Sequence, residues 1–147
     1  GTVAAATEAY LFGVPAIAFS QVDKGWHNLE SAAHFARDIV IRGFSAVDSP
    51  YLMNVNIPNL PIAEIKGLRL ARLGKRHMSE PVIQDLDAEG KPLYWIGPPG
   101  AAKDAGEGTD FFVTAQGYAS LTPLQIDLTN FKQLELLRHM KEFKDEH

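Results

Sequence analysis

The sequence of 147 residues contains no cysteine. Disulfide bonds, thiolate metal ligands and a cysteine nucleophile are therefore excluded for this chain, and the composition fits a reducing compartment. The sequence also lacks an apolar run long enough to span a bilayer, and it lacks a charged leader followed by an apolar one. We therefore expect a soluble cytoplasmic protein with no membrane partner.

A basic excess is missing as well, because 14 Lys and Arg residues stand against 18 Asp and Glu residues, for a net charge of −4. Proteins that bind nucleic acid polymers through phosphate contacts usually carry such an excess, so we expect no polymer of this kind as a partner. Hydrophobic residues make up 46% of the sequence, which is enough for a buried core. The length fits one domain.

Common catalytic motifs are absent too: there is no nucleophile elbow, no phosphate-binding P-loop, no dinucleotide glycine motif and no cluster of carboxylates. The catalytic residues therefore stay unassigned. No two histidines have the i, i+4 spacing of a helical metal site; they are His27, His34, His77, His139 and His147. His77 follows Lys75 and Arg76, and this basic stretch is either an anion contact or a solvated arm.

Helices and strands alternate in the first half of the predicted structure. An alanine-rich helix over Thr2–Phe12 is followed by a short apolar strand over Ala16–Ser20, of the kind found in buried parallel sheets. Apolar residues then recur at helical spacing from Leu29 until Gly43 ends the helix. Tyr51–Pro58 alternates like a strand and ends at proline. This order predicts an α/β fold with helices covering a sheet.

The second half has a different character. Gly67–His77 alternates apolar and basic residues, which predicts a half-exposed strand. Val82–Ile96 predicts a protruding β-hairpin, with its turn at Asp87–Gly90. The segment 97–110 is rich in glycine and proline, and we expect a long functional or interface loop there.

The last part of the chain predicts a strand and a helix. The strand covers Tyr118–Leu128, and Pro123 places it near a sheet edge or a bulge. Thr129 is a plausible N-cap for the helix that follows. One side of that helix is apolar, with Phe131, Leu134, Leu137 and either Met140 or Phe143.

The opening residues Gly1 and Thr2 allow two interpretations. At a helix N-terminus, free backbone N–H groups, the positive end of the helix dipole, small side chains and a hydroxyl together make an anion site. Alternatively, Thr2 acts only as an N-cap.

Six motifs stand in a fixed order along the chain: Gly1–Ala6 with Glu8, Leu52–Pro61, Ile65–Gly67 running into Arg69–Arg76, Tyr94–Gly100, Gly108–Asp110, and Gly117–Thr129. Together they resemble the SurE survival-protein family of metal-dependent 5′/3′-nucleotidases. The resemblance implies the C-terminal part of a Rossmann-like three-layer α/β sheet, with a protruding hairpin arm and a C-terminal helix used in oligomerisation. We expect one domain fragment made of a sheet and helix part over 1–73, the arm, loop and return strand over 74–128, and the helix over 129–147.

The resemblance also implies a function. The intact parent protein would hydrolyse phosphate from nucleoside monophosphates with a divalent cation, Mg²⁺ or Mn²⁺. Gly1 and Thr2 would lie on the phosphate side. The family's metal ligands, an Asp-Asp pair, a serine and an asparagine, would precede Gly1, so this chain would hold no metal alone and would be a fragment of the parent. A homodimer or tetramer is expected through the hairpin and the C-terminal segment.

Two other functions stay open at this point. The chain could be a non-catalytic oligomerisation fragment, since it carries no carboxylate cluster, or part of a Rossmann-like transferase that binds a phosphate ligand at Gly1 and Thr2. Tyr94 and Trp95 would either stack on a base or pack at a subunit contact.

Overall fold

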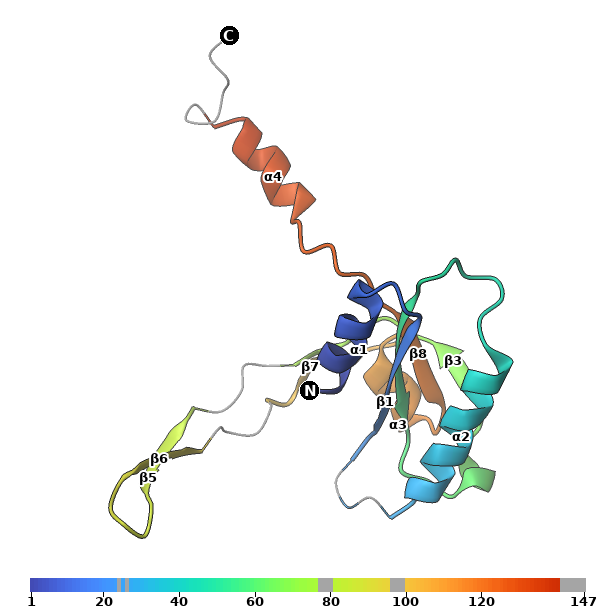
Figure 1. Ribbon diagram of the computed structural model, residues 1–147, viewed down its shortest axis with the longest axis horizontal. Helices are drawn as coiled ribbons and strands as arrows, with labels where there is room; N and C mark the ends of the chain where they lie inside the picture. Colours follow the sequence, from blue (N-terminus) through green and yellow to red (C-terminus); the bar gives the residue numbers. More distant parts are fainter. Residues whose placement is uncertain (24, 26, 77–80, 96–99, 141–147) are drawn as a thin grey trace.

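A computed structural model describes residues 1–23, 25, 27–76, 81–95 and 100–140. Its centre is a four-stranded sheet in the order β1-β2-β8-β3 (Figure 1). The strands are β1 (Ala16–Gln21), β2 (Leu52–Ile57), β8 (Ala119–Pro123) and β3 (Leu68–Leu70). β1 pairs with β2 in parallel, β8 is antiparallel to β2, and β3 is parallel to β8. The sheet is therefore mixed, and the predicted strands over 16–20 and 51–58 are confirmed.

Two predicted helices are also confirmed, α1 (Thr2–Leu11) and α2 (Leu29–Arg42). α2 ends at Gly43, which adopts φ 62° and so takes a backbone conformation that a residue with a side chain rarely adopts. The chain turns back from each helix into a strand of the same sheet, which is the βα alternation that the sequence predicts.

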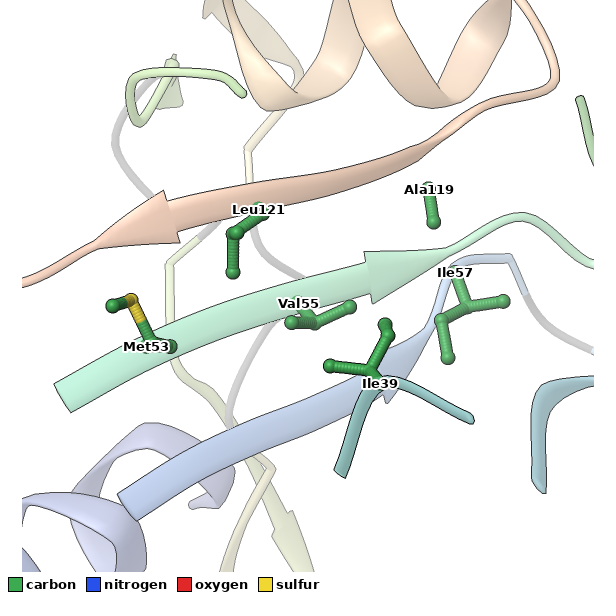
Figure 2. Packing of buried hydrophobic residues seen from close by; sticks show 6 residues of the cluster. All are labelled: Ile39, Met53, Val55, Ile57, Ala119 and Leu121. Atoms are coloured by element: carbon green, nitrogen blue, oxygen red, sulfur yellow. The ribbon is translucent and has the colours of Figure 1, made fainter. Parts of the chain in front are cut away.

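Strand β2 divides its side chains between the two faces of the sheet. Met53, Val55 and Ile57 are at most 2% exposed and belong to one buried cluster with Ile39 of α2. Figure 2 shows these side chains together with Ala119 and Leu121 of β8, which complete the cluster. Burial of each large aliphatic side chain contributes roughly 1.5–3 kcal/mol, so this face of the sheet is the main source of stability.

The opposite face of the same strands is polar. Because side chains alternate along a strand, Asn54 and Asn56 lie on the face away from α2, beside Thr122 and Ser120 of β8. α1 and α3 (Asp110–Ala115) lie against this face. The sheet is thus the middle one of three layers.

The predicted strand over 67–77 is wrong as a single element. It divides into β3, which belongs to the central sheet, and β4 (Lys75–Arg76), which pairs with β7 (Ala102–Asp104) in a separate ribbon. Between them, Arg72 forms an isolated bridge with Thr109. The chain leaves one sheet for another here, and an alternating pattern cannot reveal such a change of partner. His77 lies outside the described residues.

The predicted long loop over 97–110 is also wrong in part, because it contains β7 and leads into α3, a helix that the sequence analysis does not predict. The hydroxyl of Thr109 caps α3 by accepting a hydrogen bond from the Phe112 amide. A short 3-10 helix, η1 (Ile62–Glu64), follows β2.

Strand β8 lies between β2 and β3 rather than at a sheet edge, so the expected edge position is wrong. Pro123 is the last residue of β8, opposite Met53, and its missing N–H therefore does not interrupt the ladder. The strand ends there and does not reach Leu128.

The predicted hairpin is confirmed as β5 (Ile83–Leu86) and β6 (Pro92–Trp95). The carboxylate of Asp87 accepts hydrogen bonds from the amides of Glu89 in the turn and of Lys91 just after it, and Gly90 adopts φ 79°. We call residues 75–104 the arm; Figure 1 shows its hairpin projecting away from the sheet. Ile96 lies outside the described residues.

The C-terminal helix α4 (Phe131–Arg138) projects away from the sheet as well (Figure 1). Its N-cap is Asn130, whose side chain accepts from the Gln133 amide, one residue later than the predicted cap Thr129. Phe143 and His147 lie outside the described residues. Within the described ranges, every helix is too short or too polar to cross a membrane.

Candidate functional site

The carboxyl ends of β1 and β2 meet the N-terminus of α1, and a cavity of about 440 Å³ lies at this meeting point. In α/β sheets, ligands bind at the carboxyl ends of parallel strands, next to helix N-termini. The residues that line the cavity are Gly1, Thr2, Val3, Ala4, Ser20, Val22, Asn54, Asn56, Arg76, Asp110, Phe111 and Thr114.

The two residues predicted to bind phosphate, Gly1 and Thr2, both line this cavity. Gly1 is the N-cap of α1 and Thr2 is its first helical residue, and no side chain caps the helix. The interpretation of Thr2 as the N-cap is therefore wrong. The first amides of a helix have no partner inside it, so those of α1 are available to a ligand. Their role in binding phosphate stays a prediction.

Ser20 and Asn56 form a polar floor for the cavity next to this helix end, and Ser120 continues the same row on the sheet without lining either cavity. Ser20, Asn56 and Ser120 are register partners on three adjacent strands, so their side chains share one face. The hydroxyls of Ser120 and Thr122 are buried, and neither has a hydrogen-bond partner among the described residues. Buried polar groups are usually paired, so a polar floor of this kind is more typical of a functional face than of a packing core.

Asp110 is the carboxylate of the cavity, and three donors hold it in place. Its Oδ1 accepts from the amide of Gly74 at 2.8 Å and from that of Phe111 at 3.0 Å, and its Oδ2 accepts from Nδ2 of Asn56 at 3.3 Å. The carboxylate therefore links the floor of the cavity, the start of α3 and the base of the arm.

Arg76 brings a positive charge to the same cavity from the arm. Its guanidinium carbon lies 4.8 Å from the ring centroid of Phe111, and Nη1 donates to the carbonyl of Gly100 at 3.3 Å. A guanidinium over an aromatic face is attracted by the ring quadrupole. The side chain is thus oriented without a carboxylate partner in the described ranges.

The base of the arm is fixed by a two-pronged ion pair between Arg72 and Asp104, with N–O distances of 2.6 and 3.1 Å. The hydrogen bond from Arg72 lowers the pKa of the Asp104 carboxyl, and the same contact raises the pKa of Arg72. Both side chains are partly open to solvent, so the pair orients the arm more than it stabilises the fold.

A larger cavity of about 1300 Å³ adjoins the first, and the two share Ser20, Val22, Asn56, Arg76, Phe111 and Thr114 as lining residues. Its walls are rich in side-chain amides. Oδ1 of Asn59 accepts from Gln21 at 3.3 Å and from the side chain of Asn28 at 3.0 Å, which ties the loop after β1 to the loop after β2. The other lining residues of the larger cavity are Gln21, Asp23, Pro58, Asn59, Leu60, Ala63, Glu64, Lys66, Ala115, Gln116 and Gly117.

The comparison with known families decides the identity of this arrangement. A family model described as "Survival protein SurE" matches residues 1–80, which is more than half of the 147 residues. The chain belongs to the SurE family. It is also similar to a solved structure, the crystal structure of the SurE protein from Aquifex aeolicus, with 40% sequence identity and a TM-score of 0.71.

That similarity covers 93% of this chain but only 56% of the Aquifex SurE chain, so the chain spans little more than half the length of this relative. The expected α/β class and the resemblance to SurE are confirmed, and the mixed sheet is consistent with the Rossmann-like SurE fold. The expected use of the arm and of α4 in oligomerisation, and the division at residues 73 and 128, stay predictions.

The SurE resemblance implies a divalent cation, but the described residues do not provide a set of ligands for one. No three acidic or histidine side chains gather anywhere in the described ranges. The smaller cavity holds one carboxylate, Asp110, whose oxygens already accept three hydrogen bonds. These residues do not form a metal site by themselves, and we derive no step through a metal from them.

Four residues of this candidate site are not assigned to it by the sequence analysis: Asn56, Arg76, Asp110 and Phe111. Asp110 ends the Gly108–Asp110 motif, and Asn56 lies in the Leu52–Pro61 motif. Both motifs contribute to the resemblance to SurE, but the sequence alone gives neither residue a function. Arg76 belongs to the basic stretch for which the sequence allows either an anion contact or a solvated arm. Tyr94 and Trp95 are on the exposed hairpin and line neither cavity.

Proposed function

We propose that the protein to which this chain belongs hydrolyses phosphate from nucleoside monophosphates, as a 5′/3′-nucleotidase that depends on a divalent cation. Membership of the SurE family supports a phosphatase-type enzyme. The observation that carries the finer proposal is the pair of adjoining cavities, one small and next to a helix N-terminus, the other large and lined by amides.

The smaller cavity suits the phosphate group. The unpartnered amides at the start of α1 point toward an incoming anion, and the helix dipole favours negative charge at this end. Gly1, Thr2 and Ala4 have small side chains, which lets phosphate oxygens approach the backbone. The Thr2 hydroxyl adds a further donor.

The larger cavity suits the nucleoside. Side-chain amides of Gln21, Asn59 and Gln116 can both donate to and accept from the polar edges of a base or a ribose. Phe111 offers an aromatic face at the junction of the two cavities. Small-molecule sites typically occupy about 300–1,000 Å³, so the two cavities together have room for a nucleotide.

The cation would be held mostly by residues outside this chain, as the resemblance to SurE implies. When bound, Mg²⁺ or Mn²⁺ neutralises charge on phosphoryl oxygens and polarises water. This chain would contribute the helix N-terminus, the polar floor and Arg76. We further propose a cytoplasmic location, consistent with the cysteine-free composition, and a homodimer or tetramer assembled through the arm and α4.

The direct test is phosphate release by the full-length protein from a panel of 5′- and 3′-nucleoside monophosphates, with Mg²⁺ or Mn²⁺ added. We expect release that stops when a chelator is added and resumes when the cation is restored. Hydrolysis that is indifferent to chelation would contradict the cation dependence. Nucleotide binding without any release would instead favour a transferase, and neither binding nor release would favour a purely structural module.

A further inference from the structure

The arm contributes a charged side chain to a cavity that is otherwise formed by the central sheet and its helices. Arg76 lies on β4, at the start of the arm, and it lines both the smaller and the larger cavity. Among the described residues around the smaller cavity, it has the only cationic side chain. Arg76 therefore lies at the junction of the two cavities. If a phosphate ester placed its phosphate in the smaller cavity and its organic part in the larger one, Arg76 would be next to the bond between them.

The guanidinium of Arg76 is held in place but keeps most of its donors. Its guanidinium carbon lies over the Phe111 ring, 4.8 Å from the centroid, and among the described contacts a single N–H donates to the Gly100 carbonyl. An arginine has five N–H donors, and the others have no hydrogen-bond partner within the part of the chain that the structure describes. Asp110, the carboxylate of the same cavity, is already satisfied by three donors and does not form an ion pair with Arg76 in the described ranges.

Close packing at the base of the arm determines where Arg76 lies. A Cβ atom on Gly74 would collide with the Phe111 ring and would lie 2.6 Å from the Asp104 carbonyl oxygen, so only glycine permits this approach. The Gly74 amide also donates to Asp110. Gly74, two positions before Arg76, thus packs against the Phe111 ring over which Arg76 lies, and its amide is hydrogen-bonded to Asp110.

We propose that Arg76 binds the phosphate group of the substrate, and that the arm therefore supplies a substrate-binding residue to the site. The proposal rests on the proposed function for the identity of the substrate. Guanidinium groups recognise phosphate oxygens through paired charge-assisted hydrogen bonds. Arg76 would meet the phosphate at the junction of the two cavities, both of which it lines.

The test uses the full-length protein with inorganic phosphate as the probe, in isothermal titration calorimetry, alongside Michaelis–Menten kinetics with a nucleoside monophosphate. The variants are Arg76→Gln, which removes the charge, and Arg76→Lys, which keeps the charge but loses the fork. Lys75→Gln is the matched control, since Lys75 is the neighbouring cation on β4 and lines neither cavity. Circular dichroism spectra establish that each variant is folded.

We expect Arg76→Gln to weaken phosphate binding about 10- to 100-fold, the usual effect of losing hydrogen bonds to a charged group. Arg76→Lys should recover part of the loss, and Lys75→Gln should bind like the parent. Folded Arg76→Gln that binds phosphate as tightly as the parent would overturn the proposal, as would a parent that binds no phosphate. If the parent binds phosphate through Arg76 yet hydrolyses no nucleotide, only the proposed function fails.

Discussion

Strands β2 and β5 contain similar residues but have opposite surroundings. Five of the six residues of β2 are buried, whereas all four residues of β5 are exposed. Ile57 at the end of β2 is 1% exposed and Ile83 at the start of β5 is 61% exposed. Apolar character alone therefore does not tell a core strand from an arm strand; the number of neighbouring strands and helices does.

This difference separates two kinds of stability in one chain. The central sheet and its helices bury their apolar side chains against each other and hold the candidate site. The hairpin has only its own two-stranded ladder, which is marginal in water without further packing. Helix α4 likewise has no buried residue, and Leu128 just before it is 94% exposed. Exposed apolar surface of this kind is typical of contacts between subunits.

The largest expected effect comes from removing the C-terminal segment after Asp127. If the apolar side of α4 packs on a second subunit, it buries three or four large side chains, each worth roughly 1.5–3 kcal/mol. We expect the protein that lacks the segment after Asp127, and is otherwise complete, to be monomeric in static light scattering. Its circular dichroism spectrum should keep the signal of the central sheet. A truncated protein that stays fully dimeric would place the subunit contact elsewhere.

The next effect compares one substitution in the two regions. We expect Ile57→Ala to lower the free energy of unfolding by about 2–5 kcal/mol, because it leaves a cavity in the core. Ile83→Ala removes the same atoms from an exposed position and should change the free energy of unfolding of the monomer by less than about 0.5 kcal/mol. Urea unfolding of both variants measures the difference. Equal losses would mean that the hairpin is as well packed as the sheet.

Much of the central unit could be predicted from the sequence, because its signals are local. Helical periodicity ending at Gly43 and alternation ending at Pro58 each determine an element within a few residues, and in the arm the Gly90 turn does the same for the hairpin. The three-residue strand β7 and the six-residue helix α3 are too short to carry a periodic pattern. The internal place of β8 depends on pairing with strands more than 40 residues earlier in the chain, which no local pattern records.

The candidate site was predictable only in part for the same reason. Gly1 and Thr2 carry the signal of a helix N-terminus and do line a cavity. Arg76 and Phe111 are brought together by the arm and α3, over a separation of 35 positions in the sequence. Asn56 and Asp110 are joined across 54 positions. Contacts of this range follow from the fold and not from the spacing of residues.

A smaller effect is expected where the two regions join. Gly74→Ala places a Cβ within 2.6 Å of the Asp104 carbonyl, so the base of the arm must shift. Overpacking of this kind costs typically about 1–3 kcal/mol. Gly106→Ala is the control, because its added Cβ would meet only Asp104 Oδ1, at 3.9 Å. We expect a lower urea midpoint for Gly74→Ala than for Gly106→Ala. Equal midpoints would show that the base of the arm accommodates the added Cβ at Gly74 without loss of stability.

Thr2→Val tests whether the exposed end of α1 belongs to function rather than to stability. The substitution keeps the shape and removes the hydroxyl, and Thr2 makes no cap. We expect loss of transition-state stabilisation of about 1–3 kcal/mol in nucleotide hydrolysis, with an unchanged melting temperature. Thr7→Val is the control, since the Thr7 hydroxyl bonds the Val3 carbonyl within the helix and lines neither cavity. A lowered melting temperature with intact kinetics would give Thr2 a structural role only.

The smallest effect concerns the ion pair that orients the arm, and it depends on pH. Arg72 lowers the pKa of Asp104 through their hydrogen bond, so the folded state favours the charged carboxylate. The stabilisation is complete above the pKa of an unfolded aspartate, about 4, and is lost as the pH falls through the lower folded value. Arg72, with its raised pKa, stays charged throughout this range.

We therefore expect Arg72→Gln to lower the urea midpoint slightly at about pH 6, and expect this difference from the parent to vanish in acid well below about pH 4. Arg69→Gln is the control, because Arg69 stacks on Tyr118 and donates to Gln116, which does not titrate. Its effect on the midpoint should not change over the same range. A pH-independent effect at Arg72 would mean that its contact with Asp104 owes nothing to charge. The arm would then be oriented by packing at Gly74 and Phe111 alone.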